Sequence, residues 1–201
     1  METESQKERR LRIENAAYVV LQDKGYKGTS MLAIAKKAGC SNETLYRWYG
    51  NKQALFASLV VANAETVKSQ IEQSVQADGD TIEKLRLLGP RLLEVVTSRK
   101  AVALNRAAAG DVYHTKTLGI AIAEGGKNTI APLVGRLIQN GLDRGLLQGG
   151  TAQQIGAIYI TLLIGDVQIQ RAIGVIPELS AQERDDRADR ACAVIQQLYG
   201  A

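Results

Sequence analysis

Four polar side chains close together in the chain carry groups that could hydrogen-bond to the edges of DNA bases. They are Asn42, Glu43, Thr44 and Arg47. If this stretch is one helix, these side chains are exposed, while Leu45 and Tyr49, four residues apart, hold the helix on its support. Glu43 is the discordant member, because a carboxylate near DNA is repelled unless it accepts from the amino group of cytosine. The stretch therefore predicts a base-reading helix over residues 42–49.

Phosphate groups need hydrogen-bond donors in fixed positions, and such donors surround this predicted helix. They are the Ser30 hydroxyl with the free N–H groups that follow it from Met31, and the side chains of Tyr46, Trp48 and Lys52. A phenol or an indole offers a rigid arm with one hydrogen bond, and a lysine adds a point charge. Residues 30–52 therefore predict contacts with the DNA backbone as well.

The elements that would position these groups are short helices with clear start and stop signals. Ser30 can cap a helix that Gly39 ends, and the turn over 39–41 leads to the helix over 42–49. A supporting helix over 4–24 comes first and ends at Gly25. Two short helices joined by a Gly-containing turn are the sequence form of a helix-turn-helix. Its predicted core includes Ile34, Leu45, Leu55 and Phe56.

The stretch from Gly28 to Ser41 (GTSMLAIAKKAGCS), followed by Thr44 to Phe56 (TLYRWYGNKQALF), resembles the DNA-binding domain of TetR/AcrR-type transcriptional regulators. The resemblance covers roughly the first 60 residues. The turn glycine, the paired aromatics, the lysine and the Leu-Phe pair all stand at the separations expected for the family. Two positions depart from the family pattern. Tyr49 stands where the family usually has Phe, and Trp48 replaces the more usual Tyr or His.

This resemblance also implies roles for individual residues. The residues implied to hold phosphates are Tyr46, Lys52 and the helix start at Ser30. Those implied to approach bases are Ser41, Asn42, Thr44 and Arg47. The resemblance therefore predicts a helix-turn-helix DNA-binding domain over 1–60 and a partner that is a double-stranded DNA operator.

The remainder of the chain keeps a helical period with helix punctuation, so the sequence predicts an all-α protein. Asn51 caps a helix to about residue 76. The further predicted helices are 80–98, bent or interrupted at Gly89-Pro90, 100–109, 115–144 with a break between Gly125 and Pro132, 152–173 and 181–199. Residues 61–201 are expected to form a helical regulatory and dimerisation domain.

This second region shows a resemblance to members of the family with an AefR-like regulatory domain, at Ala103-Leu104-Asn105-Arg106. The family resemblance implies a homodimer joined through the last two long helices. It also implies a ligand cavity between the middle helices, whose filling changes the separation of the two DNA-binding heads.

The last two predicted helices carry broad apolar faces with small residues that permit close approach. Two such faces packed across a twofold axis would form a four-helix interface, although they could also close a monomeric core. The residues expected at a dimer interface are Ile155, Ile158, Tyr159, Leu162, Ala188, Ala191, Cys192, Ile195 and Tyr199.

Candidate ligand-binding residues are polar side chains within largely apolar neighbourhoods. They are Arg106, Tyr113, His114, Asp166 and Gln170. Each could instead be exposed or paired locally. Few aromatic residues follow Phe56, which favours an aliphatic-walled pocket and an apolar or amphipathic small-molecule effector.

Composition and charge exclude several classes of function. With one His and two Cys far apart, no multi-His metal site, disulfide framework or zinc site is expected, and we expect no cofactor and no catalytic residues. The N-terminus lacks the apolar run of a secretory signal, and no stretch reads as a membrane span, so a cytoplasmic protein is expected. The net charge of +4 resides in residues 1–60, which hold ten Lys and Arg against six Asp and Glu.

We therefore expect a ligand-responsive transcriptional regulator, in particular a repressor, that binds a palindromic operator as a homodimer. An alternative is a DNA-binding regulator without a small-molecule effector, controlled by a protein partner. A third is an all-helical enzyme that has kept the DNA-binding domain, which the single His and the lack of a phosphate-binding Gly loop disfavour.

Overall fold

A computed structural model describes residues 4–75, 80–113 and 115–201, and most of them lie in helices. The only β-type pairing among these residues is an isolated bridge between Leu147 and Gly200. The chain divides into two compact units, 1–62 with 103–123, and 63–102 with 124–201. The predicted all-α class is confirmed.

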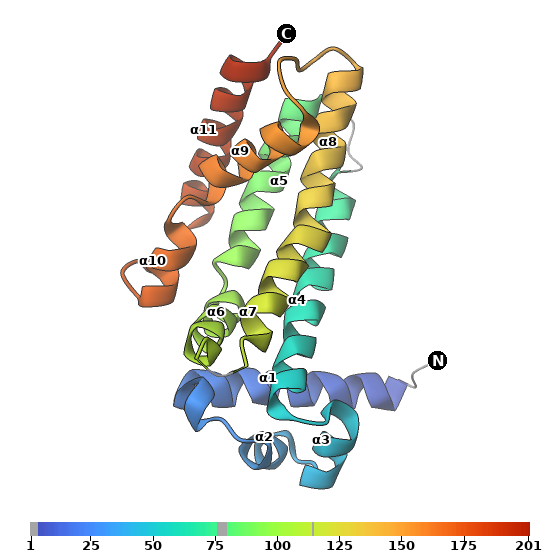
Figure 1. Ribbon diagram of the computed structural model, residues 1–201, viewed down its shortest axis with the longest axis vertical. Helices are drawn as coiled ribbons and strands as arrows, with labels where there is room; N and C mark the ends of the chain where they lie inside the picture. The colour runs from blue at the N-terminus through green and yellow to red at the C-terminus, as the bar shows by residue number, and fades with distance from the viewer. Residues whose placement is uncertain (1–3, 76–79, 114) are drawn as a thin grey trace. The chain divides into compact units, whose positions relative to one another are not determined.

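The first unit is built around a support helix and two short helices. These are α1 (Glu4–Gly28), α2 (Met31–Ala38) and α3 (Asn42–Tyr49). In Figure 1, α2 and α3 lie next to each other on one side of α1, and α2 contacts both of the others. Gly25 has φ 65° and ψ 173°, so the regular part of α1 ends where the sequence predicts.

Three further segments complete the core of this unit. They are the start of α4 (Lys52–Val75), the end of α6 (Arg99–Asp111) and most of α7 (Thr117–Gly125). Leu55 and Phe56 of α4 are fully buried, and so is Leu118 of α7, while Leu104 and Ala107 of α6 are at most 3% exposed. All five belong to one apolar cluster with residues of α1, α2 and α3. The core of the first unit therefore draws on residues far beyond position 60.

The second unit is a helical bundle. Its main helices are α5 (Thr81–Val96), α8 (Ala131–Asp143), α9 (Ala152–Ile164) and α11 (Ala181–Tyr199). Helix α11 packs against α5 and α9, and α8 packs against the same two helices. Gly89 permits this packing, because a Cβ there would lie 2.6 Å from the Cβ of Ala188. The core of the bundle contains leucine and isoleucine side chains from all four helices.

Three predicted helices differ from the observed ones. The predicted helix over 152–173 is two helices, α9 and α10 (Val167–Ile173), because Gly165 takes φ 50° between them. Helix α5 continues through Pro90 without interruption. The break expected between Gly125 and Pro132 is a π-helical turn over Gly126–Ile130, which connects α7 to α8.

Candidate nucleic-acid interface

The start of α2 is fixed by a side-chain cap. Ser30 has an extended backbone, and its hydroxyl accepts a hydrogen bond of 3.2 Å from the N–H of Ala33. Met31 is 5% exposed and packs in the apolar cluster, so only its backbone N–H can face a ligand. The predicted anion-binding helix start is therefore present as a capped N-terminus. Gly39, with φ 66°, ends α2 as predicted.

Helix α3 begins with a second cap, at Ser41. The Ser41 hydroxyl accepts a hydrogen bond of 3.1 Å from the N–H of Thr44, and the Ser41 and Thr44 hydroxyls lie 2.9 Å apart. Both hydroxyls thus bond within the cap of the helix. Leu45 is fully buried and fixes α3 against its support. The cap and this anchor determine which side chains of α3 point outward.

The outward face of α3 carries one acidic, one aromatic and one basic side chain. Glu43 and Arg47 are exposed, and Tyr46 is 49% exposed. Asn42 is only partly exposed, and its Oδ1 is buried without a hydrogen-bond partner in the described part of the chain. Trp48 is also partly exposed and packs against the core of the first unit. The face therefore offers donors and an acceptor on a rigid helix.

Lys52, at the first position of α4, has a contact that sequence reasoning missed. Its Nζ donates to the backbone carbonyls of Tyr26, at 2.9 Å, and Thr29, at 3.0 Å. The same ammonium lies 4.3 Å from the centre of the Tyr26 ring. Lys52 therefore joins the start of α4 to the segment between α1 and α2. Two of its three protons are used, which leaves one for a further acceptor.

A buried carboxylate acts on this contact. Asp111, at the end of α6, is 1% exposed and accepts a 2.6 Å hydrogen bond from the Thr115 hydroxyl. Burial lowers the pKa of Lys52, and the negative charge of Asp111 opposes this change. Burial, followed by the charge of Asp111, raises the pKa of Tyr26 to about 12. No local sequence signal connects Asp111 to Lys52, because the two residues are far apart in the chain.

Tyr26 is the centre of this arrangement. Its ring packs edge-on against Phe56, with centroids 5.5 Å apart and planes at 74°. Its hydroxyl is buried and has no hydrogen-bond partner among the described residues. Tyr26, Lys52 and Asp111 together brace the turn that precedes Ser30. The position of the α2 N-terminus therefore depends on groups from α1, α4 and α6.

Four of the five ligand-binding residues predicted from the sequence lie among the described residues. Arg106 is exposed, and Tyr113 is 93% exposed. Asp166 and Gln170 bond to each other through Gln170 Nε2 at the start of α10. His114 lies outside the described residues. For the described candidates, the alternative of local pairing or exposure is thus the observed arrangement.

Most of the residues expected at a dimer interface are already buried within one chain. Six side chains are at most 2% exposed and pack in the core of the second unit: Ile155, Tyr159, Ala188, Ala191, Cys192 and Ile195. The Tyr159 hydroxyl donates to the carbonyl of Leu85 at 2.7 Å. Only Ile158, Leu162 and Tyr199 keep exposed surface. The six buried side chains cover each other within the chain, so a partner chain would have to contact residues that stay exposed.

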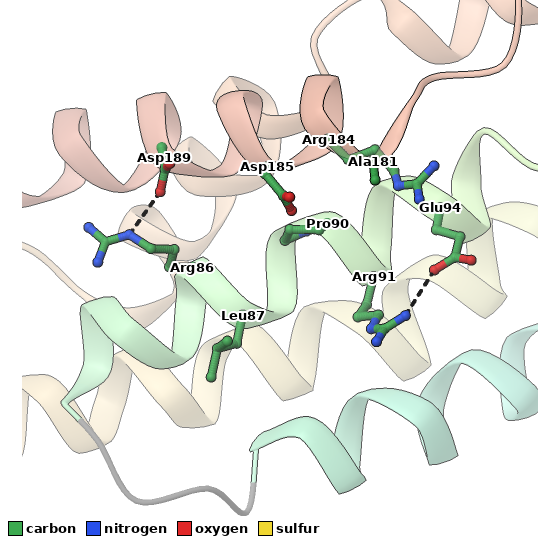
Figure 2. Close-up of a pocket in the computed structure, with 9 residues that line it drawn as sticks. All are labelled: Arg86, Leu87, Pro90, Arg91, Glu94, Ala181, Arg184, Asp185 and Asp189. Carbon is green, nitrogen blue, oxygen red and sulfur yellow. Dashed lines mark hydrogen bonds and ion pairs between the residues drawn. The ribbon is translucent and has the colours of Figure 1, made fainter.

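A groove of about 470 Å³ lies between α5 and α11. Figure 2 shows its charged lining, in which Arg86 pairs with Asp189 at 2.9 Å and Arg91 pairs with Glu94 at 3.3 Å. None of the predicted ligand-binding residues lines this groove. These two pairs are exposed, and Arg184, which is partly buried, donates to the carbonyl of Leu179 at 2.7 Å.

The described residues contain no cluster of three or more His, Cys, Asp or Glu side chains that could hold a metal ion. None of their helices is both long enough and apolar enough to cross a membrane.

Capped helices α2 and α3, their exposed polar face and the support of α1 define a helix-turn-helix protein with a separate helical bundle. Residues 13–59 match the family model described as bacterial regulatory proteins, tetR family. Residues 83–201 match the C-terminal domain of AefR-like transcriptional repressors. The chain belongs to the TetR family of transcriptional regulators, as the sequence predicted. Members of this family bind DNA and are not enzymes.

Known proteins agree with this assignment. The chain is 29% identical over 126 residues to the repressor KstR of Mycolicibacterium smegmatis, and the match covers 58% of this chain and 61% of KstR. The chain thus spans about three fifths of the length of that curated relative. A TetR-family regulator from Mesorhizobium loti aligns over the full length of both chains, with a TM-score of 0.85 and 27% identity.

A second solved structure is similar in fold alone. It is the regulator FadR of Bacillus subtilis in complex with stearoyl-CoA, with a TM-score of 0.71 and 16% identity over 92% of this chain and 96% of FadR.

Proposed function

We propose that this chain is a repressor that binds a palindromic operator as a homodimer and is released by a small apolar or amphipathic effector. The observation that carries the proposal is the geometry of α3, which is capped by Ser41, anchored by Leu45 and exposes Glu43, Tyr46 and Arg47. A helix of this kind fits the major groove, where base edges are distinguishable. The protein would act in the cytoplasm, with the DNA contacts within residues 1–60 and regulation within 61–201, of which 103–123 also complete the core of the first unit.

Phosphate binding would come from groups around α3. The N-terminus of α2 at Ser30 and the Tyr46 hydroxyl are accessible to a phosphate. The third proton of the Lys52 ammonium would reach a phosphate while the other two hold the carbonyls of Tyr26 and Thr29. Lys52 would thus brace the α1–α2 turn and bind the DNA backbone at the same time.

A dimer would be formed by apolar side chains that the single chain leaves exposed. In the second unit Leu162 is 39% exposed. Four more apolar side chains are between 59% and 66% exposed: Ile169, Ile173, Val175 and Leu198. They lie on α9, α10, the segment after α10 and α11. Burying them against a second copy would remove apolar surface from water. A twofold axis would then present two α3 helices to two half-sites.

The class of effector is supported by the fold. FadR, which shares this fold, is in complex with stearoyl-CoA, an amphipathic molecule with a long acyl chain. An effector of this class would act through its different affinities for the DNA-binding and the released geometry. The alternative regulator, without an effector and controlled by a protein partner, would bind the same DNA.

Selection of bound sites from random DNA tests the proposal. A palindromic site with half-sites about one helical turn apart is expected, together with a sedimentation mass of two chains. Release of DNA is then measured with acyl-CoAs and free fatty acids of increasing length. Recovery of no specific site would reject DNA-sequence recognition, and a chain that stays monomeric on DNA would reject the dimer. Release by no ligand of these classes would favour control by a protein partner.

A further inference from the structure

Helix α3 presents one carboxylate on the face that is proposed to read DNA. Glu43 is the second residue of α3 and is exposed. Arg47 lies four residues later on the same side of the helix, where glutamate and arginine commonly form an ion pair. In the part of the chain that the structure describes, neither side chain forms an ion pair or a hydrogen bond. Both groups therefore remain available to DNA.

The hydroxyls beside Glu43 are less available. Ser41 and Thr44 bond to each other in the cap of α3, and Asn42 is partly covered. The exposed side chains of the helix itself are thus Glu43, Tyr46 and Arg47. Of these, Tyr46 is the residue proposed to hold a phosphate. Base discrimination then falls mainly to one acidic and one basic side chain.

A carboxylate has few partners in the major groove. It only accepts hydrogen bonds, and the donors there are the amino groups of cytosine and adenine. Adenine places its acceptor N7 next to that amino group, which repels the second carboxylate oxygen, whereas cytosine presents the amino group alone. The phosphates on either side repel the carboxylate at every sequence. A carboxylate on this face is therefore favourable only opposite cytosine.

We propose that Glu43 is a specificity-determining residue that accepts a hydrogen bond from the amino group of one cytosine in each half-site. This inference rests on the proposed function of α3 as the base-reading helix. Glu43 acts in two ways. It weakens binding to DNA in general through charge repulsion, and it restores affinity where cytosine supplies a donor. Its effect on selectivity is thus larger than its effect on affinity for the operator.

The variant Glu43→Gln tests this role, because an amide has nearly the same shape and matches the N6 and N7 groups of adenine. Sites are selected from random DNA with each protein, and binding to the wild-type site and to its single-base variants is then titrated. The wild-type protein is expected to require cytosine at one position of each half-site. For Glu43→Gln, preference at that position should move toward adenine, with a change of about 5- to 150-fold in the ratio of affinities. Its affinity for unrelated DNA should rise.

Glu124→Gln is the matched control, because Glu124 is exposed on α7 and the substitution removes the same charge. It should leave base preference unchanged. Thermal unfolding should show nearly equal stability for Glu43→Gln and wild type, since Glu43 forms no hydrogen bond or ion pair among the described residues and only its favourable charge in the first turn of α3 is lost. If Glu43→Gln gains affinity equally for all sequences and keeps the wild-type preference, the inference is overturned while α3 still reads DNA. If the wild-type protein selects no site, the proposed function fails first.

Discussion

Lys52→Met removes the ammonium that holds the carbonyls of Tyr26 and Thr29 but keeps most of the aliphatic stem. Each hydrogen bond from a charged donor contributes about 1.5–3 kcal/mol. Because Lys52 is only partly buried, water can replace part of the loss. We therefore expect the free energy of unfolding of the first unit to fall by about 3 kcal/mol. The substitution should also remove one phosphate contact per chain.

Trp48 makes this measurement specific, since it is the only tryptophan in the chain and lies in α3. Urea unfolding followed by its fluorescence reports on the helix-turn-helix, and DNA titrations at several salt concentrations report on phosphate contacts. The slope of log K against log salt should decrease by about 0.9 for each chain on the DNA. Lys24→Met is the control, because Lys24 is exposed on α1 and its side chain forms no hydrogen bond or ion pair in the described residues.

Two results would contradict this reasoning separately. If Lys52→Met unfolds within about 0.5 kcal/mol of Lys24→Met, the ammonium does not brace the turn. If stability falls but the salt slope stays unchanged in folded protein, Lys52 is structural and does not bind phosphate. A double-mutant cycle with Asp111→Asn measures the charge interaction, and a coupling energy near zero would show that Asp111 does not act on Lys52.

Two further predictions concern the second unit. Gly89→Ala should lower the free energy of unfolding by about 1–3 kcal/mol in spite of the better helix propensity of Ala, because the new Cβ meets Ala188 at 2.6 Å and the Tyr159 hydroxyl at 2.9 Å. Circular dichroism melting tests this prediction. The control Gly119→Ala, whose new Cβ meets nothing within 4 Å, should not destabilise the protein. Equal melting temperatures of the two variants would refute the close packing at Gly89. Burial raises the pKa of the Cys192 thiol to about 11, above its unfolded value of 9.0, so its contribution to stability is complete below about pH 9 and is lost as the pH rises toward 11. Iodoacetamide at pH 8 should accordingly label Cys40 and spare Cys192 until urea unfolds the chain, and equal labelling rates without urea would contradict the burial.

Helices with two clear end signals could be predicted from the sequence. Helix α2 begins after the predicted cap at Ser30 and ends at Gly39, and α3 and α11 have the predicted bounds, 42–49 and 181–199. Gly165 was harder to interpret, because a glycine can continue a helix at a cost of about 1 kcal/mol or leave it with positive φ. Here it takes φ 50° and divides the predicted helix.

The residues around α3 were predicted by type, but their contacts were not. Ser41 and Thr44 were predicted as base contacts, and both bond in the helix cap. Lys52 reaches carbonyls that precede it by more than twenty residues, and Asp111 acts from α6. Periodicity shows which face of a helix is apolar, but it does not show what covers that face. This is why six residues of α9 and α11 that are expected at a dimer interface are found buried within one chain.

The shared core of the first unit limits how this protein can be divided. Leu104, Ala107 and Leu118 pack with α1–α4. A fragment cut after residue 60 would lack these three side chains. The apolar residues of α1–α4 that they cover would then be exposed to water, and the fragment would tend to aggregate. A hybrid regulator that joins this DNA-binding head to a foreign sensor domain would therefore need to retain residues 103–123. Such hybrids could be assembled only if the transplanted sensor accommodates this second segment, so recombination at a single crossover point should rarely give a working protein.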